Sequence, residues 1–359
     1  MVCIAAFIIL IIVGVFVAFL SIFKRDLGRK YLKVLKKSWH CFTRHITFRK
    51  CDTSFQDDVK TALLKKVVLK KPEAVKPLSI TIEIASVLIV IITAWSLVEG
   101  IKAGLALWAL GTCNVSHPAS CALGAESCSI DEEDLNWFSE WGEIFAAIPD
   151  RLKVWNADDY LVTPVESINE LALPDYALAN GTPSALDIMD PGCTVCLSSF
   201  RNQLKDQSFL EKHVVYIMLY VIKNPDGTPK FKNSELITNY YYALLLTDAE
   251  SGKGDDSSYA DLSLKLLNRL YTESSSDHQN WQYLFDNEYD SEAAEKTLKN
   301  WLGEWGLSDA QIKSIAEKSA SSDVESHIEK IRSRIENDIK PKGIPTMIYD
   351  GRKHLGLYK

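Results

Sequence analysis

Two long apolar runs stand out in the first third of the chain. Residues 4–23, IAAFIILIIVGVFVAFLSIF, carry no charged side chain, and a helix of that length spans the roughly 30 Å hydrocarbon core of a bilayer. Residues 78–98 are apolar except for Glu83, which lies near enough to the end of the run to reach the headgroups. We therefore predict two transmembrane helices, the second continuing as an interfacial extension to residue 111. Because basic residues follow the first run and do not precede it, we expect it to be retained and not cleaved as a signal peptide.

The next pattern is amphipathic. In residues 131–155 apolar side chains recur at steps of three and four, which is typical of a helix with one apolar face; they are Leu135, Phe138, Trp141, Phe145 and Ile148. That face must pack on the globular domain or on the bilayer surface. The acidic polar face favours the domain, because anionic lipid would repel it. Residues 155–182 carry Pro, Asn, Asp and Gly signals and are predicted to be mainly a connecting loop.

From residue 184 onward the pattern predicts a mixed α/β domain. Residues 184–190 favour a strand, 193–209 a helix, and 213–222 a buried strand rich in β-branched and aromatic residues. Strand, helix and strand in this order form a βαβ unit. A helical region follows over about 234–337, and two short strands flanking Gly351 end the chain as a hairpin.

Charge divides the chain and predicts its orientation. Residues 24–77 hold sixteen Lys and Arg against five Asp and Glu, whereas residues 112–359 hold twenty-three against forty. Basic loops stay on the cytoplasmic side, so we expect the loop inside and both the N-terminus and the C-terminal part outside. The acidic C-terminal part makes nucleic acid an unsuitable partner. The expected segments are a transmembrane helix at 1–23, a cytoplasmic loop at 24–77, a transmembrane helix with its extension at 78–111, a cysteine-containing connector at 112–182 and a folded domain at 183–359.

Within the folded domain, Cys193 and Cys196 stand two residues apart at the start of the predicted helix, and Asp187 lies six residues before Cys193. A structural disulfide within the pair would close a very short loop and gain little stability. Metal binding would need ligands beyond the pair. The third reading, a redox centre, depends on the surrounding fold.

With its cysteine pair at a helix start, a second apolar strand, a helical insertion and the sequence GIPT before a hairpin, the region of about 183–359 resembles the thioredoxin superfamily and its DsbA-like branch. The resemblance implies an α/β thioredoxin-like fold with a helical insertion, here preceded by two transmembrane helices. It implies that Cys193 and Cys196 are the redox pair and that Asp187 moves the proton of the second cysteine. It also implies a cis-proline at Pro345 that faces the disulfide, with Ile344 and Thr346 beside it in the substrate-binding strand.

Elementary thiol chemistry supports the same roles for these residues. Unpaired N–H groups and the dipole at a helix N-terminus stabilise a thiolate, so Cys193 is the expected nucleophile. Cys196, one turn further, can attack a mixed disulfide formed by Cys193 and is the expected resolving thiol. A buried Cys196 needs a base, and Asp187 in an apolar strand, with a raised pKa, can serve.

The residues between the cysteines depart from the resemblance. The strongest oxidants of that branch hold a histidine there, whereas this chain has Thr194 and Val195. These side chains tune the redox centre without positive charge, so we expect Cys193 to be less acidic than in those relatives.

Three further cysteines lie in the connector, at Cys113, Cys121 and Cys128. With His117 they could form a Cys3His metal site, but an oxidising compartment favours a disulfide. Because three is an odd number, Cys3 could supply a partner, or one of the thiols could relay electrons to the folded domain.

Together these features predict a membrane-anchored extracytoplasmic thiol:disulfide oxidoreductase, whose direction of exchange the sequence does not fix. We expect no cofactor and no resident metal. The expected partners are extracytoplasmic cysteine-containing proteins, a membrane or soluble redox partner, and the lipid bilayer. Two alternatives stay open: a non-catalytic membrane scaffold that binds a partner through its thioredoxin-like domain, and a copper-carrying thiol protein.

Overall fold

The computed structural model describes residues 75–118, 127–130, 134–173, 181–251, 259 and 261–358, together with Lys36 and Trp39. By internal packing the chain divides into two compact units, residues 1–102 and 103–359. The predicted span at 4–23, nearly all of the basic loop, and Cys3 and Cys121 lie outside the described residues.

The second predicted span lies in helix α4 (Val75–Leu110), which continues through the predicted interfacial extension. At 1.5 Å per residue the helix is about 54 Å long, more than the hydrocarbon core of a bilayer requires. Apolar side chains such as Ile84, Leu88 and Ile92 are exposed along it. Among the described residues, 76–110 is the one stretch long and apolar enough to cross a membrane.

Helix α5 (Trp137–Leu152) forms where the amphipathic pattern predicts it, and the Asn136 side chain caps it by accepting from two backbone N–H groups of its first turn. Its predicted apolar stripe is covered only in part, because Trp141 and Ile148 are half-buried whereas two of its phenylalanines are exposed. Phe138 is 78% exposed and Phe145 is 56% exposed, whereas Ile144, outside the stripe, is the buried residue. Periodicity locates an apolar face on a helix, but it does not say which surface covers that face.

A four-stranded sheet with the order β3-β2-β5-β6 forms the centre of the folded domain. Its strands are β2 (Ser184–Met189), β3 (Val214–Leu219), β5 (Thr346–Tyr349) and β6 (Arg352–Leu355). Strands β2 and β3 pair in parallel, and β5 runs antiparallel to both β2 and β6. The two parallel strands are buried almost throughout, as their apolar sequences predict. Asp350 and Gly351 turn the terminal hairpin with positive φ values of 50° and 73°, which confirms the predicted hairpin.

The helix predicted over 193–209 is in fact two helices, α7 (Thr194–Lys205) and α8 (Gln207–Lys212). Asp206 separates them, because its side chain accepts from the backbone N–H of Phe209 at 3.1 Å and thereby caps α8. The Tyr358 hydroxyl donates to the other carboxylate oxygen at 2.8 Å, so the break is fixed from the C-terminus as well.

The predicted connecting loop at 155–182 belongs in part to the core. It contains the short elements η3 (Ala157–Asp159) and α6 (Asn169–Ala172). Trp155, Tyr160 and Ile168 are buried. The Ile168 backbone donates to the carbonyl of Val215 at 2.9 Å, which ties the segment to β3. The turn-forming residues in this segment predict a loop, and the local sequence pattern does not show that part of the loop packs in the core.

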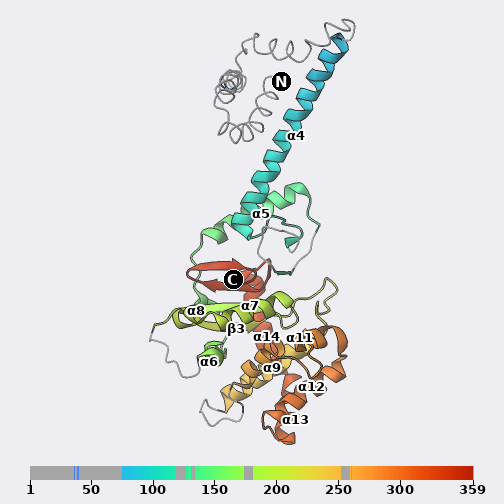
Figure 1. Ribbon diagram of the computed structural model, residues 1–359. Coiled ribbons are helices and arrows are strands. Elements are labelled where there is room, and N and C mark those ends of the chain that lie inside the picture. The colour runs from blue at the N-terminus through green and yellow to red at the C-terminus, as the bar shows by residue number, and fades with distance from the viewer. Residues whose placement is uncertain are drawn as a thin grey trace, which may run out of the picture. The chain divides into compact units, whose positions relative to one another are not determined.

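The insertion between β3 and the terminal strands is helical, as predicted. Its elements are α9 (Ser234–Glu250), α10 (Leu262–Thr272), α11 (Trp281–Tyr283), η4 (Leu284–Glu288), α12 (Ser291–Glu304), α13 (Asp309–Ser319), α14 (Ser322–Ser333) and η5 (Arg334–Ile339). Within the folded domain these helices gather on the β3 side, whereas the C-terminal hairpin, drawn in red, lies on the other side (Figure 1). Tyr242 of α9 joins the cluster to the sheet, because its hydroxyl accepts from the backbone N–H of Leu219 at 2.7 Å.

Candidate active site

The cysteine pair lies after strand β2, at the start of helix α7. Cys193 is the N-cap residue of α7 in extended conformation, and Cys196 lies one turn into the helix. Both side chains are completely buried. Their position at a helix start confirms the sequence prediction of where the pair lies, although their bonding differs from it.

Cys193 is bonded to Cys128 of the connector and not to Cys196. The two Cα atoms lie 6.4 Å apart, within the range that disulfides span. Cys196 is a free, buried thiol. Sequence reasoning named both Cys128 and Cys193 but did not pair them, because a bond between residues 65 positions apart leaves no mark in local pattern.

The segment that carries Cys128 is a short strand against the predicted substrate-binding edge. Strand β1 (Cys128–Ser129) pairs antiparallel with β4 (Gly343–Ile344), with Cys128 opposite Ile344. The bond between Ile344 and Pro345 is cis, as the resemblance implies. The Ile344 carbonyl oxygen lies 3.8 Å from Cys193 Sγ. The structure thus brings the cysteine pair, the cis-proline strand and Cys128 together.

Thr346, predicted beside Pro345, is buried, and its hydroxyl donates to the Gly343 carbonyl at 2.6 Å. The Pro345 carbonyl accepts from the Gly356 backbone at 2.7 Å. These two bonds fix the backbone around Pro345, the residue that joins β4 to β5. They position the edge on which Cys128 lies.

Asp187 lies in the middle of β2 and is fully buried. Burial raises its pKa to about 7, and a hydrogen bond from the Gln203 side-chain amide on α7 opposes part of that shift. This agrees with the raised pKa expected from the sequence. Burial also raises the pKa of the Cys196 thiol well above its usual range, and the negative charges of Asp187 and Asp190 raise it further. The negative charge of Asp187, the expected base, therefore acts on the thiol of Cys196, the expected resolving cysteine.

Asp190 is a second buried acid, and sequence reasoning missed it. Its carboxylate accepts from the Gly192 backbone at 2.9 Å, from the Ile222 backbone at 2.7 Å and from the Ser234 hydroxyl. Burial raises its pKa to about 6 against these bonds. Its backbone carbonyl accepts from the Tyr271 hydroxyl at 3.0 Å. The signal in the sequence was the turn-forming Asp-Pro-Gly before Cys193, since aspartate readily bonds the backbone two residues on.

Gly192 is required by close packing. A Cβ atom at this position would lie 2.2 Å from Cβ of Phe231, closer than any real contact. Any larger residue must displace Phe231 or the turn that presents Cys193.

The remaining predicted site residues that the structure describes do not bond to Cys193. Thr194 is exposed and Val195 is half-buried at the start of α7, and both side chains are uncharged. Cys113 is disulfide-bonded, but Cys193 is not its partner. Cys121 lies outside the described residues.

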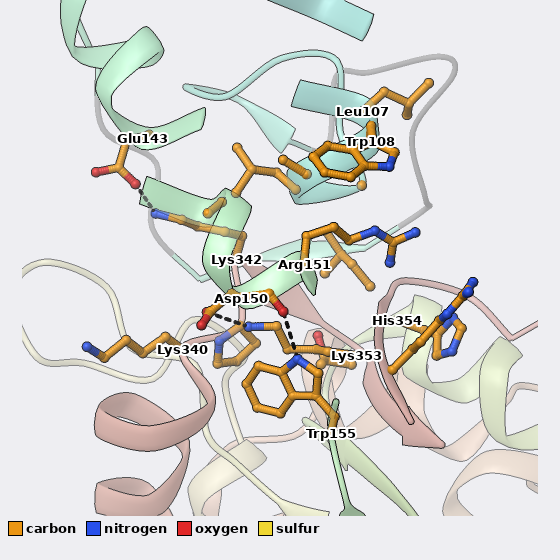
Figure 2. A pocket seen from close by; sticks show the side chains of 18 of the residues that line it. Leu107, Trp108, Glu143, Asp150, Arg151, Trp155, Lys340, Lys342, Lys353 and His354 are labelled. Atoms are coloured by element: carbon orange, nitrogen blue, oxygen red, sulfur yellow. Dashed lines mark hydrogen bonds and ion pairs between the residues drawn. The ribbon is translucent and has the colours of Figure 1, made fainter. Parts of the chain in front are cut away.

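A separate cavity of about 630 Å³ opens beside β6 (Figure 2). Its walls carry both charges: Lys342 bonds Glu143 at 2.7 Å, and Lys353 contacts Asp150 at 3.3 Å. Thr346 is the one predicted site residue among those that line it. No cysteine lines the cavity, so it does not belong to the sulfur cluster.

A comparison with models of protein families finds no match, and neither does a comparison with curated protein sequences. Among solved structures the chain is similar to the thiol-disulfide oxidoreductase MdbA from Corynebacterium diphtheriae, with 16% identity over 53% of this chain and 86% of that one and a TM-score of 0.35. It is similar to the thiol-disulfide exchange protein alpha-DsbA2 from Wolbachia pipientis, with 15% identity over 54% and 84% and a TM-score of 0.33. It is also similar to the cytosolic disulfide reductase DsbM from Pseudomonas aeruginosa, with 18% identity over 48% and 87% and a TM-score of 0.31. Likenesses this distant carry no functional inference, so any function must be argued from the chain's own residues.

Proposed function

We propose that this chain is a membrane-anchored thiol:disulfide oxidoreductase that exchanges disulfides with extracytoplasmic cysteine-containing proteins through Cys193 and Cys196. One observation carries the proposal. Cys193, at the N-terminus of α7, is bonded to the cysteine of a strand that pairs with the residue before cis-Pro345. This is the arrangement that a disulfide-bonded peptide substrate would adopt, because extended peptides bind by adding a strand to an exposed edge.

The exchange divides into two steps. A thiolate of the substrate attacks a Cys193–Cys196 disulfide at Cys193, which joins the substrate to Cys193 and leaves Cys196 as a thiolate that takes up a proton. A second substrate thiolate then attacks the sulfur of the first, which releases an oxidised substrate and reduced Cys193. The reverse sequence reduces a substrate, with Cys196 attacking Cys193 to release it.

Asp187 would serve the steps in which Cys196 gains or loses a proton. A carboxyl group with a pKa of about 7 is partly ionised near neutral pH, so it can both accept and return a proton. Cys196, whose pKa is raised by burial, needs such a base before it can attack.

The proposed location rests on the apolar and charged segments. The exposed apolar side chains of α4 suit a bilayer, and the exposed Phe138 and Phe145 of α5 suit its surface. The basic charge of residues 24–77 favours the cytoplasmic side for that loop and the outside for the folded domain, with the run at 4–23 as a first span. Protease added to intact spheroplasts that express the chain should digest the folded domain and spare the basic loop. Digestion of the loop alone would contradict the orientation.

The test of the activity uses the full-length chain in detergent micelles. Wild-type protein should accelerate the reduction of insulin by dithiothreitol, and Cys193→Ser should abolish the acceleration. Cys113→Ser is the matched control, because it removes a bonded cysteine of the connector outside the cluster and should keep most of the activity. A Cys193→Ser protein that is folded and as active as wild type would refute the proposal.

The two other functions predict different results. A scaffold would show no thiol chemistry in the intact wild-type protein while still capturing a partner. A copper carrier would retain stoichiometric Cu(I) after gel filtration, and Cys193→Ser would abolish retention.

A further inference from the structure

Cys128 is the one cysteine in the cluster to which the proposed exchange assigns no part. It lies in a two-residue strand, and it is half-buried against the core. In place of an external substrate, this chain's own segment 127–130 lies on the cis-proline edge. The occupant of the substrate position is therefore known from the structure itself.

The edge fits this segment closely. A Cβ atom on Gly343 would lie 2.8 Å from Ser127 Oγ and 3.0 Å from the Cys128 carbonyl oxygen, so any larger residue there requires the segment of Cys128 to shift. Ser127 is buried there, and Ile130 packs against the core. Contact thus extends on both sides of the sulfur.

The docked segment also covers the nucleophile. Cys193 has no exposed surface, so a protein thiol cannot reach it in this state. Cys196 has no exposed surface either, but it is one helical turn from Cys193 and is a free thiol. The sulfur that can open the Cys128–Cys193 bond from within the described cluster is therefore Cys196.

We infer that Cys128 is a third redox-active cysteine, which caps Cys193 in the substrate position and is exchanged on and off by Cys196. This inference rests on the proposed function. In the opening step Cys196 loses its proton to Asp187 and attacks Cys193 Sγ; the Cys128–Cys193 bond breaks as the Cys193–Cys196 bond forms. Cys128 leaves as a thiolate and takes up a proton from water. One disulfide and one thiol stand on each side of the step, so no external oxidant or reductant is needed.

The consequence is a competition for one edge. In the capped form the disulfide joins Cys128 to Cys193 and is inaccessible to substrate at Cys193. In the open form the disulfide joins Cys193 to Cys196, and the cis-proline edge can bind a substrate. A substrate that is oxidised through the Cys193–Cys196 disulfide reacts with the open form only, so capping lowers its rate in proportion to the fraction of molecules that is open. If the open form makes up about one tenth of the molecules, the rate falls about tenfold.

The test maps the cysteines and measures one rate on the full-length chain in detergent micelles, purified without reductant. Acid-quenched, alkylated wild-type protein should yield a crosslinked peptide pair containing Cys128 and Cys193, with Cys196 alkylated. Cys196→Ser should give this crosslink in every molecule, because nothing within the cluster can open it. Gly343→Ala should lower the crosslink yield while keeping every cysteine, because its Cβ clashes with Ser127 and Cys128 and weakens the binding of segment 127–130 to the edge.

The measured rate is that of peptide oxidation in a single turnover. The peptide is fluorescent, carries two reduced cysteines and is present in excess. Cys128→Ser should react about tenfold faster than wild type if the closed form dominates as above. The control is the double variant Cys113→Ser/Cys121→Ser, which removes the other two connector cysteines and should react as wild type does. A wild-type map with Cys128 alkylated in most molecules, or a Cys128→Ser rate equal to that of wild type, would overturn this inference alone. A Cys193→Ser protein that still oxidises the peptide would overturn the proposed function instead.

Discussion

The buried carboxyl group of Asp187 should make the folded domain less stable as pH rises, and Asp187→Asn should remove that dependence. The group has a folded-state pKa of about 7 against an ordinary value of 3.8, and burial is the cause. Between these values the folded chain binds more protons than the unfolded chain, so the stability of the fold falls as pH rises through this window. Asparagine has nearly the same shape and cannot ionise.

The size of the effect follows from the shift. At 1.36 kcal/mol per pKa unit, the raised pKa of Asp187 destabilises the folded state relative to the unfolded state by about 4 kcal/mol at pH 8 but only by roughly 1.5 kcal/mol at pH 5. The asparagine side chain can keep the hydrogen bond from Gln203, but its amide replaces an oxygen that has no partner in the described residues. That buried amide adds a cost that does not depend on pH. The diagnostic quantity is therefore the change with pH, about 2.5 kcal/mol between pH 5 and pH 8.

The assay is thermal unfolding of the full-length chain in detergent micelles, followed by tryptophan fluorescence at several pH values. For a domain of this size 1 kcal/mol shifts Tm by about 2–4 °C, so Tm of Asp187→Asn relative to wild type should rise by about 5–10 °C from pH 5 to pH 8. Asp190 and Glu166 titrate in the same window but are present in both proteins, so their effects cancel. Asp277→Asn, at an exposed aspartate, is the matched control and should follow wild type. A Tm difference between Asp187→Asn and wild type that stays constant with pH would refute the reasoning.

Three further predictions concern packing, a buried hydrogen bond and an exposed side chain. Gly192→Ala should lower the free energy of unfolding by about 1–3 kcal/mol because its Cβ meets Phe231, and melting measures it; an unchanged Tm would contradict the contact. Ser234→Ala removes a donor from buried Asp190 and should cost about 1–3 kcal/mol while raising the pKa of Asp190 further, so the loss in Tm should be larger at pH 8 than at pH 5; equal losses would count against it. Phe145→Ser should change the free energy of unfolding in micelles by less than about 0.5 kcal/mol because the side chain is exposed, and a loss of several kcal/mol would show that the domain buries it after all.

The sequence predicts those parts of the fold that depend on residues close together in the chain. The continuous apolar runs of β2 and β3 predict buried strands, and Asp350 with Gly351 predicts the hairpin turn. The helix start at Cys193 follows from the Pro-Gly turn before it. Each signal lies within a few residues of the structure that it specifies.

What the sequence does not predict depends on contacts between distant segments. The Cys128–Cys193 bond needs the connector to lie on the cis-proline edge, which no spacing of cysteines reveals. The stripe on α5 shows an apolar face, but the local pattern does not predict which surface would cover Phe145, which is exposed. Asp190 appears in sequence as a turn residue, and its burial follows only once Ser234 of the insertion packs against it.

The central claim is that the disulfide at Cys193 is an exchangeable redox centre and not a permanent staple. The most direct test equilibrates the full-length chain in glutathione and dithiothreitol buffers of graded potential, then quenches with acid and alkylates. Mass spectrometry of the peptide that carries Cys193 then gives the oxidised fraction at each potential. We predict a reversible two-electron transition at Cys193 with a midpoint between about −270 and −120 mV, the range of proteins that exchange disulfides. A Cys193 that stays oxidised below about −300 mV, as structural disulfides do, would contradict the account.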